Sequence, residues 1–314
     1  MTVLEVTQEL ETRKQPSAIA VKNVLYATDF SDTSEAAFPY ATAICRKFGS
    51  TLHVAHVFSD STLMLMTGGA DNASFEVLYE DARSLAQQKV DQIAARLRDT
   101  PTRTYVRHGE VWDKLSPIIA ENGIDLIVVG TRGRGGIGKF LLGSVAEDIL
   151  RHAPCPVLTV GPGICGPARL QEFSASGPAP VEFALRHILY ATNLTAESLG
   201  VAPVAFSLAA QFQSRLTLIH VVEGDSRLGI LSKPEDDEIR KLREEIPTAS
   251  LAYAPEVLVE FGSAWRCIVN KAAEQGADLL VLGAHRANGM SHLPWSTVHH
   301  VVAHATCPVL TIRA

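Results

Sequence analysis

Short, continuous apolar runs alternate along this chain with longer stretches in which apolar residues recur every three or four positions. The runs are typical of buried strands, and the periodic stretches are typical of amphipathic helices. In the first half we expect strands at 21–27, 51–58, 102–107, 126–129 and 157–160, and helices at 34–48, 75–97, 111–121 and 145–152. This alternation predicts an α/β fold in which helices cover both faces of a parallel sheet.

The second half of the chain repeats the first. Residues 188–193 (ILYATN) restate 24–29 (VLYATD), and 216–221 restate 52–57. Further blocks at 262–265, 277–283 and 307–311 follow in the order of 109–112, 124–130 and 155–159. Matching blocks in one order indicate a tandem duplication. We therefore expect domains at 20–161 and 185–314, joined by a linker at 162–184 that is rich in Gly, Pro, Ser and Ala.

A basic, glycine-rich loop follows the fourth apolar run. The helix after it begins near Ser144, which stands where a helix N-cap belongs. The free N–H groups and the dipole of a helix N-terminus attract anions. Arg132, Arg134 and Lys139 add positive charge, and glycines let a backbone approach a ligand closely. The loop therefore predicts a phosphate site, and a glycine-rich surface loop without a ligand is the alternative.

Two familiar phosphate-binding motifs are matched only in part by this loop. The spacing Gly133-x-Gly135-x-x-Gly138 matches a dinucleotide fingerprint, but this strand is not the first, and no acid stands about 20 residues further on. The glycines at 133 and 138 with Lys139 nearly match a P-loop. Phe140, however, occupies the position of the Ser or Thr that binds magnesium.

A third pattern, Gly130-x-x-Gly133 followed by Gly143-Ser144, resembles the ATP-binding motif of the universal stress protein family. The duplication resembles that of its tandem two-domain members. The resemblance implies two doubly wound, five-stranded parallel sheets of order 3-2-1-4-5, of the adenine-nucleotide alpha-hydrolase-like type. It also implies ATP as the ligand, with Mg or Mn as its metal.

The same resemblance implies a set of contacts with ATP. Ala27, Thr28 and Asp29 would contact the base and ribose, Val57 would meet adenine through its backbone, Gly130 would lie by the ribose, and Gly133, Gly143, Ser144 and Val145 would hold the phosphates beside Arg132. No catalytic residue and no metal-ligating side chain is expected. If strands one and four are neighbours, Asp29 and Gly130 face one crevice. The alternative for Asp29 is a helix cap, a role that Ser31 or Asp32 could also fill.

The second half departs from this pattern. Asn193 replaces Asp29, Arg286 replaces Gly133, and Trp295 replaces Gly143. These changes remove a carboxylate, add a Cβ where the backbone needs none, and place a large ring in the phosphate space. We expect no ATP there, which leaves another ligand or a docking role.

Other candidate chemistry is weaker. His300 and His304 have a helical spacing that suits zinc, but His152 repeats His304 in the other half, which favours a role in the fold. We interpret His56 as a core residue with a hydrogen bond. Cys155 begins a strand with no base near it in the sequence, as does Cys307, and both are expected to be small buried residues.

Composition narrows the class of protein. The 314 residues are 46% hydrophobic and 20% charged, with a net charge of -6. That balance fits two soluble domains and offers no basic field for nucleic acid. The five cysteines form no CxxC pair, and residues 1–20 contain no sustained apolar segment. We expect a cytoplasmic protein without a membrane segment.

These observations predict an ATP-binding stress or regulatory module that senses nucleotide through its first domain. The alternatives are a slow ATPase, a phosphoryl or nucleotidyl transferase, or an ATP-independent scaffold. Phosphoryl transfer needs a residue that orients the nucleophile, and the loop offers no acid, so enzymatic activity is left uncertain. The fifth strands, at 157–160 and 309–312, are apolar edges. We expect them to dock as an internal pseudo-dimer, and a homo-oligomer is left open.

Overall fold

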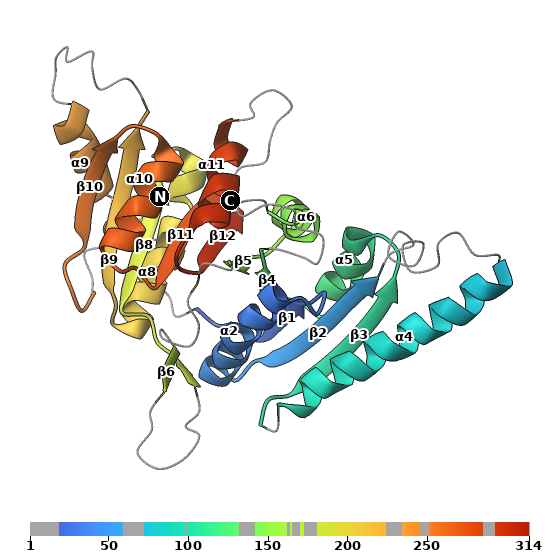
Figure 1. Ribbon diagram of the computed structural model, residues 1–314. Coiled ribbons are helices and arrows are strands. Elements are labelled where there is room, and N and C mark those ends of the chain that lie inside the picture. Colours follow the sequence, from blue (N-terminus) through green and yellow to red (C-terminus); the bar gives the residue numbers. More distant parts are fainter. Residues whose placement is uncertain are drawn as a thin grey trace, which may run out of the picture. The chain divides into compact units, whose positions relative to one another are not determined.

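The computed structural model describes residues 19–58, 72–97, 99–131, 142–161, 164, 170–172, 181–223, 234–244, 246, 251–284 and 293–313. The chain divides into two compact units. We call Val21–Phe183 the first half, and Ala184–Ala314 with Met1–Ala20 the second half. Each half is described by itself (Figure 1).

The first half is a parallel sheet with helices on both faces. Its elements are β1 (Asn23–Ala27), α2 (Asp32–Phe48), β2 (Thr51–Phe58), α4 (Asn72–Ala95), β3 (Thr102–His108), α5 (Val111–Glu121), β4 (Leu126–Gly130), α6 (Ser144–His152) and β5 (Val157–Val160). The strand order is β3-β2-β1-β4-β5, and every neighbouring pair is parallel. Helices α2 and α4 cover one face, and α5 and α6 cover the other (Figure 1). The predicted fold and strand order are confirmed.

The second half repeats this sheet. Its elements are β8 (His187–Thr192), α7 (Ala196–Leu199), α8 (Ala202–Phe212), β9 (Arg215–Val222), α9 (Pro234–Glu244), β10 (Glu256–Phe261), α10 (Ala264–Glu274), β11 (Leu279–Ala284), α11 (Leu293–His304) and β12 (Val309–Arg313). The order is β10-β9-β8-β11-β12, again parallel throughout.

The first helix of each half differs in its continuity. α2 runs unbroken through Pro39, whereas its counterpart is split into α7 and α8 just before Pro203. Gly200 ends α7 where the first half has Ala36. Proline weakens a helix by removing a hydrogen bond, and glycine adds a further entropic cost. Together they interrupt a helix that proline alone leaves continuous.

The pattern-based bounds hold closely. β2, α5 and β5 have the predicted ends, while α2 begins two residues earlier and α4 three residues earlier than expected. The expected linker contains structure that its composition did not predict. β6 (Leu170–Glu172) pairs antiparallel with β7 (Val181–Phe183).

The last strand of each sheet is the expected one, β5 in the first half and β12 in the second. Docking of these two strands on each other stays a prediction. Among the helices in the described ranges, none is both long and apolar enough to cross a membrane.

Candidate functional site

Three strands of the first half end at one edge of the sheet. β1 pairs with β2 on one side and with β4 on the other, and Ala27 lies in register with Ala55 and with Val129. The expectation that strands one and four are neighbours is therefore confirmed. Asp29 and Gly130, which follow those strands, lie at the carboxyl edge where ligands bind in doubly wound sheets.

The turn after β1 is fixed by the Asp29 side chain. Asp29 Oδ1 accepts hydrogen bonds from the backbone N of Ser31 at 3.0 Å and from Ser31 Oγ at 2.6 Å. The N-cap of α2 is Ser31, whose Oγ accepts from Ser34 N at 3.3 Å. Asp29 is thus not the helix cap. Between them, Phe30 has a positive φ of 60°, a conformation that costs free energy in a non-glycine residue and is often found at functional sites.

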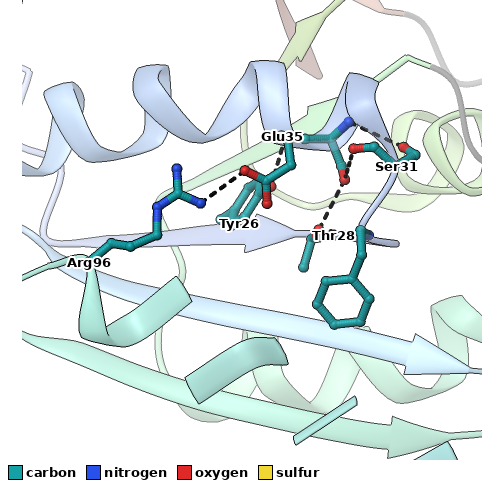
Figure 2. A network of polar contacts seen from close by, with 7 residues as sticks. Tyr26, Thr28, Ser31, Glu35 and Arg96 are labelled. Carbon is teal, nitrogen blue, oxygen red and sulfur yellow. Dashed lines mark hydrogen bonds and ion pairs between the residues drawn. The ribbon is translucent and has the colours of Figure 1, made fainter. Parts of the chain in front are cut away.

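A buried polar network holds this turn onto α2 (Figure 2). Tyr26 Oη donates to Ser34 O at 2.7 Å, and Ser34 Oγ donates to Ser31 O at 2.9 Å. The single Ser34 hydroxyl proton is thereby used, so Thr28 Oγ1 donates to Ser34 Oγ at 3.0 Å. Thr28 Oγ1 in turn accepts from the backbone N of Phe30 at 3.0 Å. Burial raises the pKa of Tyr26 to about 12, which keeps its hydroxyl a donor.

Arg96 ties the end of α4 to the start of α2. Its Nη1 lies 2.9 Å from Glu35 Oε2 (Figure 2). Its guanidinium carbon lies 4.3 Å from the centre of the Phe38 ring. Both charged side chains are substantially exposed, so the pair contributes at most about 1 kcal/mol. It fixes geometry more than it adds stability.

His56 supports the turn from β2. Its Nδ1 donates to the backbone O of Thr28 at 2.8 Å, and its ring lies 4.2 Å from that of Phe30. The hydrogen bond predicted for His56 is confirmed, although the residue is half-buried and not in the core. Sequence reasoning missed Phe30, which also lies under the Lys89 ammonium at 5.2 Å. The sequence did offer a signal, because Phe30 directly follows Asp29.

Gly130 is required by packing. A Cβ at this position would lie 2.7 Å from Thr33 O and 2.9 Å from Ser34 N. The first turn of α2 therefore rests directly on the end of β4, and no larger residue fits without a backbone shift. The predicted place of Gly130 beside the ribose stays a prediction.

The start of α6 corrects one expectation. The N-cap is Gly143, not Ser144, which is the first helical residue. Because Gly143 has no side chain, the cap makes no side-chain hydrogen bond to the first turn. Its backbone N donates to Thr131 O at 2.7 Å, which brings the open helix end beside the end of β4. The predicted phosphate residues Arg132 and Gly133 lie outside the described residues.

The acids of α6 are engaged with partners on the same helix. Glu147 Oε1 lies 2.7 Å from Arg151 Nη2, and Asp148 Oδ1 lies 2.9 Å from His152 Nδ1. These residues, except His152, line a cavity of about 330 Å³ together with Ser144. Each acid is thus paired with a residue one turn further along α6.

The polar network of the first half recurs in the second. Tyr190 Oη donates to Ser198 O, Thr192 Oγ1 bonds Ser198 Oγ at 2.8 Å, Asn193 Oδ1 accepts from Thr195 N and Oγ1, and His220 Nδ1 donates to Thr192 O at 2.9 Å. Leu194 takes the place of Phe30, with a φ of 61°. The turn is therefore a property of the duplicated fold.

The second half also has a measurable cavity at this edge, of about 430 Å³. Its walls include Ala191, Thr192, Asn193, Val221, Gly283 and Thr297. By the repeat these correspond to Ala27, Thr28, Asp29, Val57, Gly130 and Val145. Counterparts of six positions predicted for the nucleotide site thus line one cavity among the described residues of the second half.

The universal stress protein family model matches residues 20–161 and again 184–313. The chain belongs to the universal stress protein family. A putative universal stress protein of Staphylococcus haemolyticus is 31% identical over 150 residues, which cover 45% of this chain and 86% of the relative. A universal stress protein of Methanocaldococcus jannaschii is 31% identical over 140 residues, covering 44% of this chain and 81% of that protein.

Nearly the whole chain also matches a solved structure. A universal stress protein from Archaeoglobus fulgidus matches with a TM-score of 0.65 and 19% identity, covering 93% of this chain and 98% of its own. At that identity the match supports the fold alone. This chain is a tandem universal stress protein.

The two halves of this universal stress protein differ where the phosphates are expected. α6 begins at Ser144, after Gly143. α11 begins at Leu293 and already includes Trp295, the counterpart of Gly143. The helix of the second half therefore begins at Leu293, three residues before Ser296, the counterpart of Ser144. Arg286, the other predicted obstruction, lies outside the described residues.

The histidines that suggested a metal site pack against tryptophan. The rings of His300 and His304 lie 5.3 and 4.8 Å from that of Trp265, and His152 lies 5.4 Å from Trp112 in the first half. His292, which precedes α11 in the sequence and was a further candidate, lies outside the described residues. The repeated stacking supports the predicted role in the fold.

The cysteines considered as nucleophiles differ in their exposure to solvent. Cys307 is buried, and Cys155 is half-buried. Burial raises the pKa of the Cys155 thiol to about 12. A thiol with such a pKa is protonated at neutral pH and is a poor nucleophile.

Proposed function

We propose that this universal stress protein binds ATP in its first half and acts as a nucleotide-sensing stress or regulatory module. The observation that carries the proposal is the start of α6. Gly143 supplies no capping side chain, and its backbone N bonds Thr131 O at the end of β4. The unpaired N–H groups and dipole of such a helix end favour a phosphate, and the Asp29 turn lies at the same sheet edge.

The proposed contacts divide between the two ends of the crevice. Ala27, Thr28, Asp29, the backbone of Val57 and Gly130 would serve the base and ribose, and Arg132, Gly133, Gly143, Ser144 and Val145 would serve the phosphates. The internal repeat supports this grouping, since counterparts of residues from both sets line one cavity in the second half.

A divalent ion, Mg or Mn, would come with the nucleotide. The acids near the α6 N-terminus, Glu147 and Asp148, are paired with Arg151 and His152. The ion would therefore be held chiefly by phosphate oxygens, and its role would be to neutralise their charge. Ser144, the first residue of α6, carries a side-chain hydroxyl at the end of the helix where the phosphates are proposed to bind.

Nucleotide analysis of the purified chain tests the proposal. Extraction and mass spectrometry should find ATP bound to the protein as isolated, and an ADP time course at saturating ATP should show little or no turnover. Steady ADP production would favour a slow ATPase, and label moving to an acceptor would favour a phosphoryl or nucleotidyl transferase. A chain that binds no adenine nucleotide would be a scaffold, contrary to the proposal.

We further propose that the two halves pair through β5 and β12 as an internal pseudo-dimer. The apolar side chains of these last strands support this pairing, because burying apolar surface between the halves would stabilise the paired form. Expression of Met1–Pro162 alone should give a homodimer in analytical ultracentrifugation. A strictly monomeric fragment that still binds ATP would contradict the pairing.

A further inference from the structure

The cavity of the second half is mainly apolar in its walls. The sheet contributes Ala191, Ile219 and Leu282, while α10 contributes Ile268 and α11 contributes Val298. Its volume of about 430 Å³ lies within the range of small-molecule sites, which are about 300–1,000 Å³. The walls favour a ligand with an apolar body.

Asn193 gives this cavity a donor where the first half has an acceptor. Its Oδ1 accepts from the backbone N of Thr195 at 3.3 Å and from Thr195 Oγ1 at 2.9 Å. The backbone N–H must face the amide oxygen, so the Asn193 Nδ2 group occupies the position of the second carboxylate oxygen of Asp29. A ligand here needs a hydrogen-bond acceptor.

Glu223 gives the cavity a negative charge. Its Oε1 accepts from the backbone N of Ala264 at 3.3 Å, and both residues line the cavity. The carboxylate is therefore held at the start of α10. No lysine or arginine is among the described residues that line this cavity, and the Glu223 carboxylate would repel an anionic ligand.

These features together define a ligand class. We propose that the second half binds an uncharged heteroaromatic molecule of nucleoside size, with an acceptor for Asn193 and a donor for Glu223, and that it discriminates against the phosphorylated form. This inference goes beyond the proposed function and does not depend on it, because the cavity is formed by the second half alone.

The test uses the full chain with Gly143→Trp, which closes the proposed ATP site of the first half. Adenosine, guanosine, cytidine and uridine, and the four matching 5′-monophosphates, are titrated by calorimetry and by saturation-transfer NMR. We expect at least one nucleoside to bind, and its monophosphate to bind at least about tenfold more weakly, as like-charge repulsion requires. Failure of ATP binding in the wild-type first half would leave this result unaffected.

Two variants locate the binding. Thr297→Trp places a ring in the cavity from a half-buried helix position and should abolish nucleoside binding. Glu223→Gln should bring the affinities for nucleoside and monophosphate closer together, while Glu121→Gln, with the same charge change in the first half, should leave both unchanged. The proposal is overturned if no nucleoside binds at millimolar concentration. It is also overturned if Thr297→Trp leaves binding intact, or if nucleoside and monophosphate bind equally.

Discussion

The two halves share the scaffold of the strand-end turn and differ at the positions that would face a ligand's charge. Thr28 and Thr192 make the same hydrogen bonds, and each accepts a histidine donor on its backbone O. Asp29 and Asn193 hold the same turn with one side-chain oxygen. Only the second atom of each side chain differs, an acceptor in one half and a donor in the other. The hydrogen bonds that both halves share are therefore required by the fold, whereas the difference between Asp29 and Asn193 would affect the ligand.

The largest expected effect comes from copying the second half's tryptophan into the first. Gly143 has φ −68° and ψ 146°, an extended conformation that any residue adopts, so Gly143→Trp should fold normally. Hydrogen bonds to charged groups contribute about 1.5–3 kcal/mol each, and losing two or more phosphate contacts should weaken ATP at least about a hundredfold. Calorimetry measures the affinity, and a melting curve without nucleotide is the control. Unchanged affinity would remove α6 from the site.

Asp29→Asn tests the charge difference alone. Oδ1 can still accept from Ser31, so the turn is kept, while one charged acceptor is lost. The cost of about 1.5–3 kcal/mol corresponds to about ten- to a hundredfold weaker ATP binding. Glu121→Asn, on the exposed end of α5, is a control for net charge. If ATP affinity is unaltered, Asp29 serves the turn only.

Gly130→Ala and Gly283→Ala compare two equivalent glycines, the last residue of β4 and the last but one of β11. The new Cβ would lie 2.7 Å from Thr33 O in the first half, but 3.2 Å from its nearest neighbour, Ser198 Cα, in the second. Overpacking lowers the free energy of unfolding by about 1–3 kcal/mol. We expect the loss for Gly130→Ala at the upper end of this range and the loss for Gly283→Ala at the lower end. Urea unfolding measures both. Equal losses would mean that α2 moves away from β4 as easily as α7 moves from β11.

The smallest expected effect is on the pH dependence of stability. In the first half, Nε2 of His53 on β2 lies 3.2 Å from Oδ1 of Asn23 on β1. In the second half, Nε2 of His187 on β8 lies 2.9 Å from Oγ1 of Thr217 on β9. The histidine is therefore on the second strand of the first half and on the first strand of the second half. Burial lowers the pKa of both histidines below the ordinary value of 6.5. The unfolded chain therefore binds more protons, and stability is full above pH 6.5 and falls as the pH drops through the folded-state pKa values.

The double variant His53→Thr, His187→Asn copies each position from the other half. Its urea midpoint should change less between pH 7.5 and pH 5 than that of the parent chain. The same change in both proteins would place the acid sensitivity elsewhere.

Much of the fold could be predicted, because apolar runs and internal repeats are local signals. Positions that depend on backbone angles could not. The choice between Gly143 and Ser144 as N-cap depends on φ and ψ at a single residue, and the helix break at Gly200 depends on a proline that the first half tolerates. The packing reason for Gly130 is a contact with Thr33, far away in sequence, which no spacing reveals. In the candidate site, the sequence motif identified Asp29, whereas Phe30 is recognised only by its positive φ in the structure.

The central claim is that one half of the duplicated chain holds ATP and the other does not. Calorimetric titration of the nucleotide-free chain measures this directly as the number of ATP molecules bound per chain. We predict one ATP for the parent chain, one for Thr297→Trp in the second half, and none for Gly143→Trp in the first. Two ATP molecules per chain, or one that survives Gly143→Trp, would contradict the account.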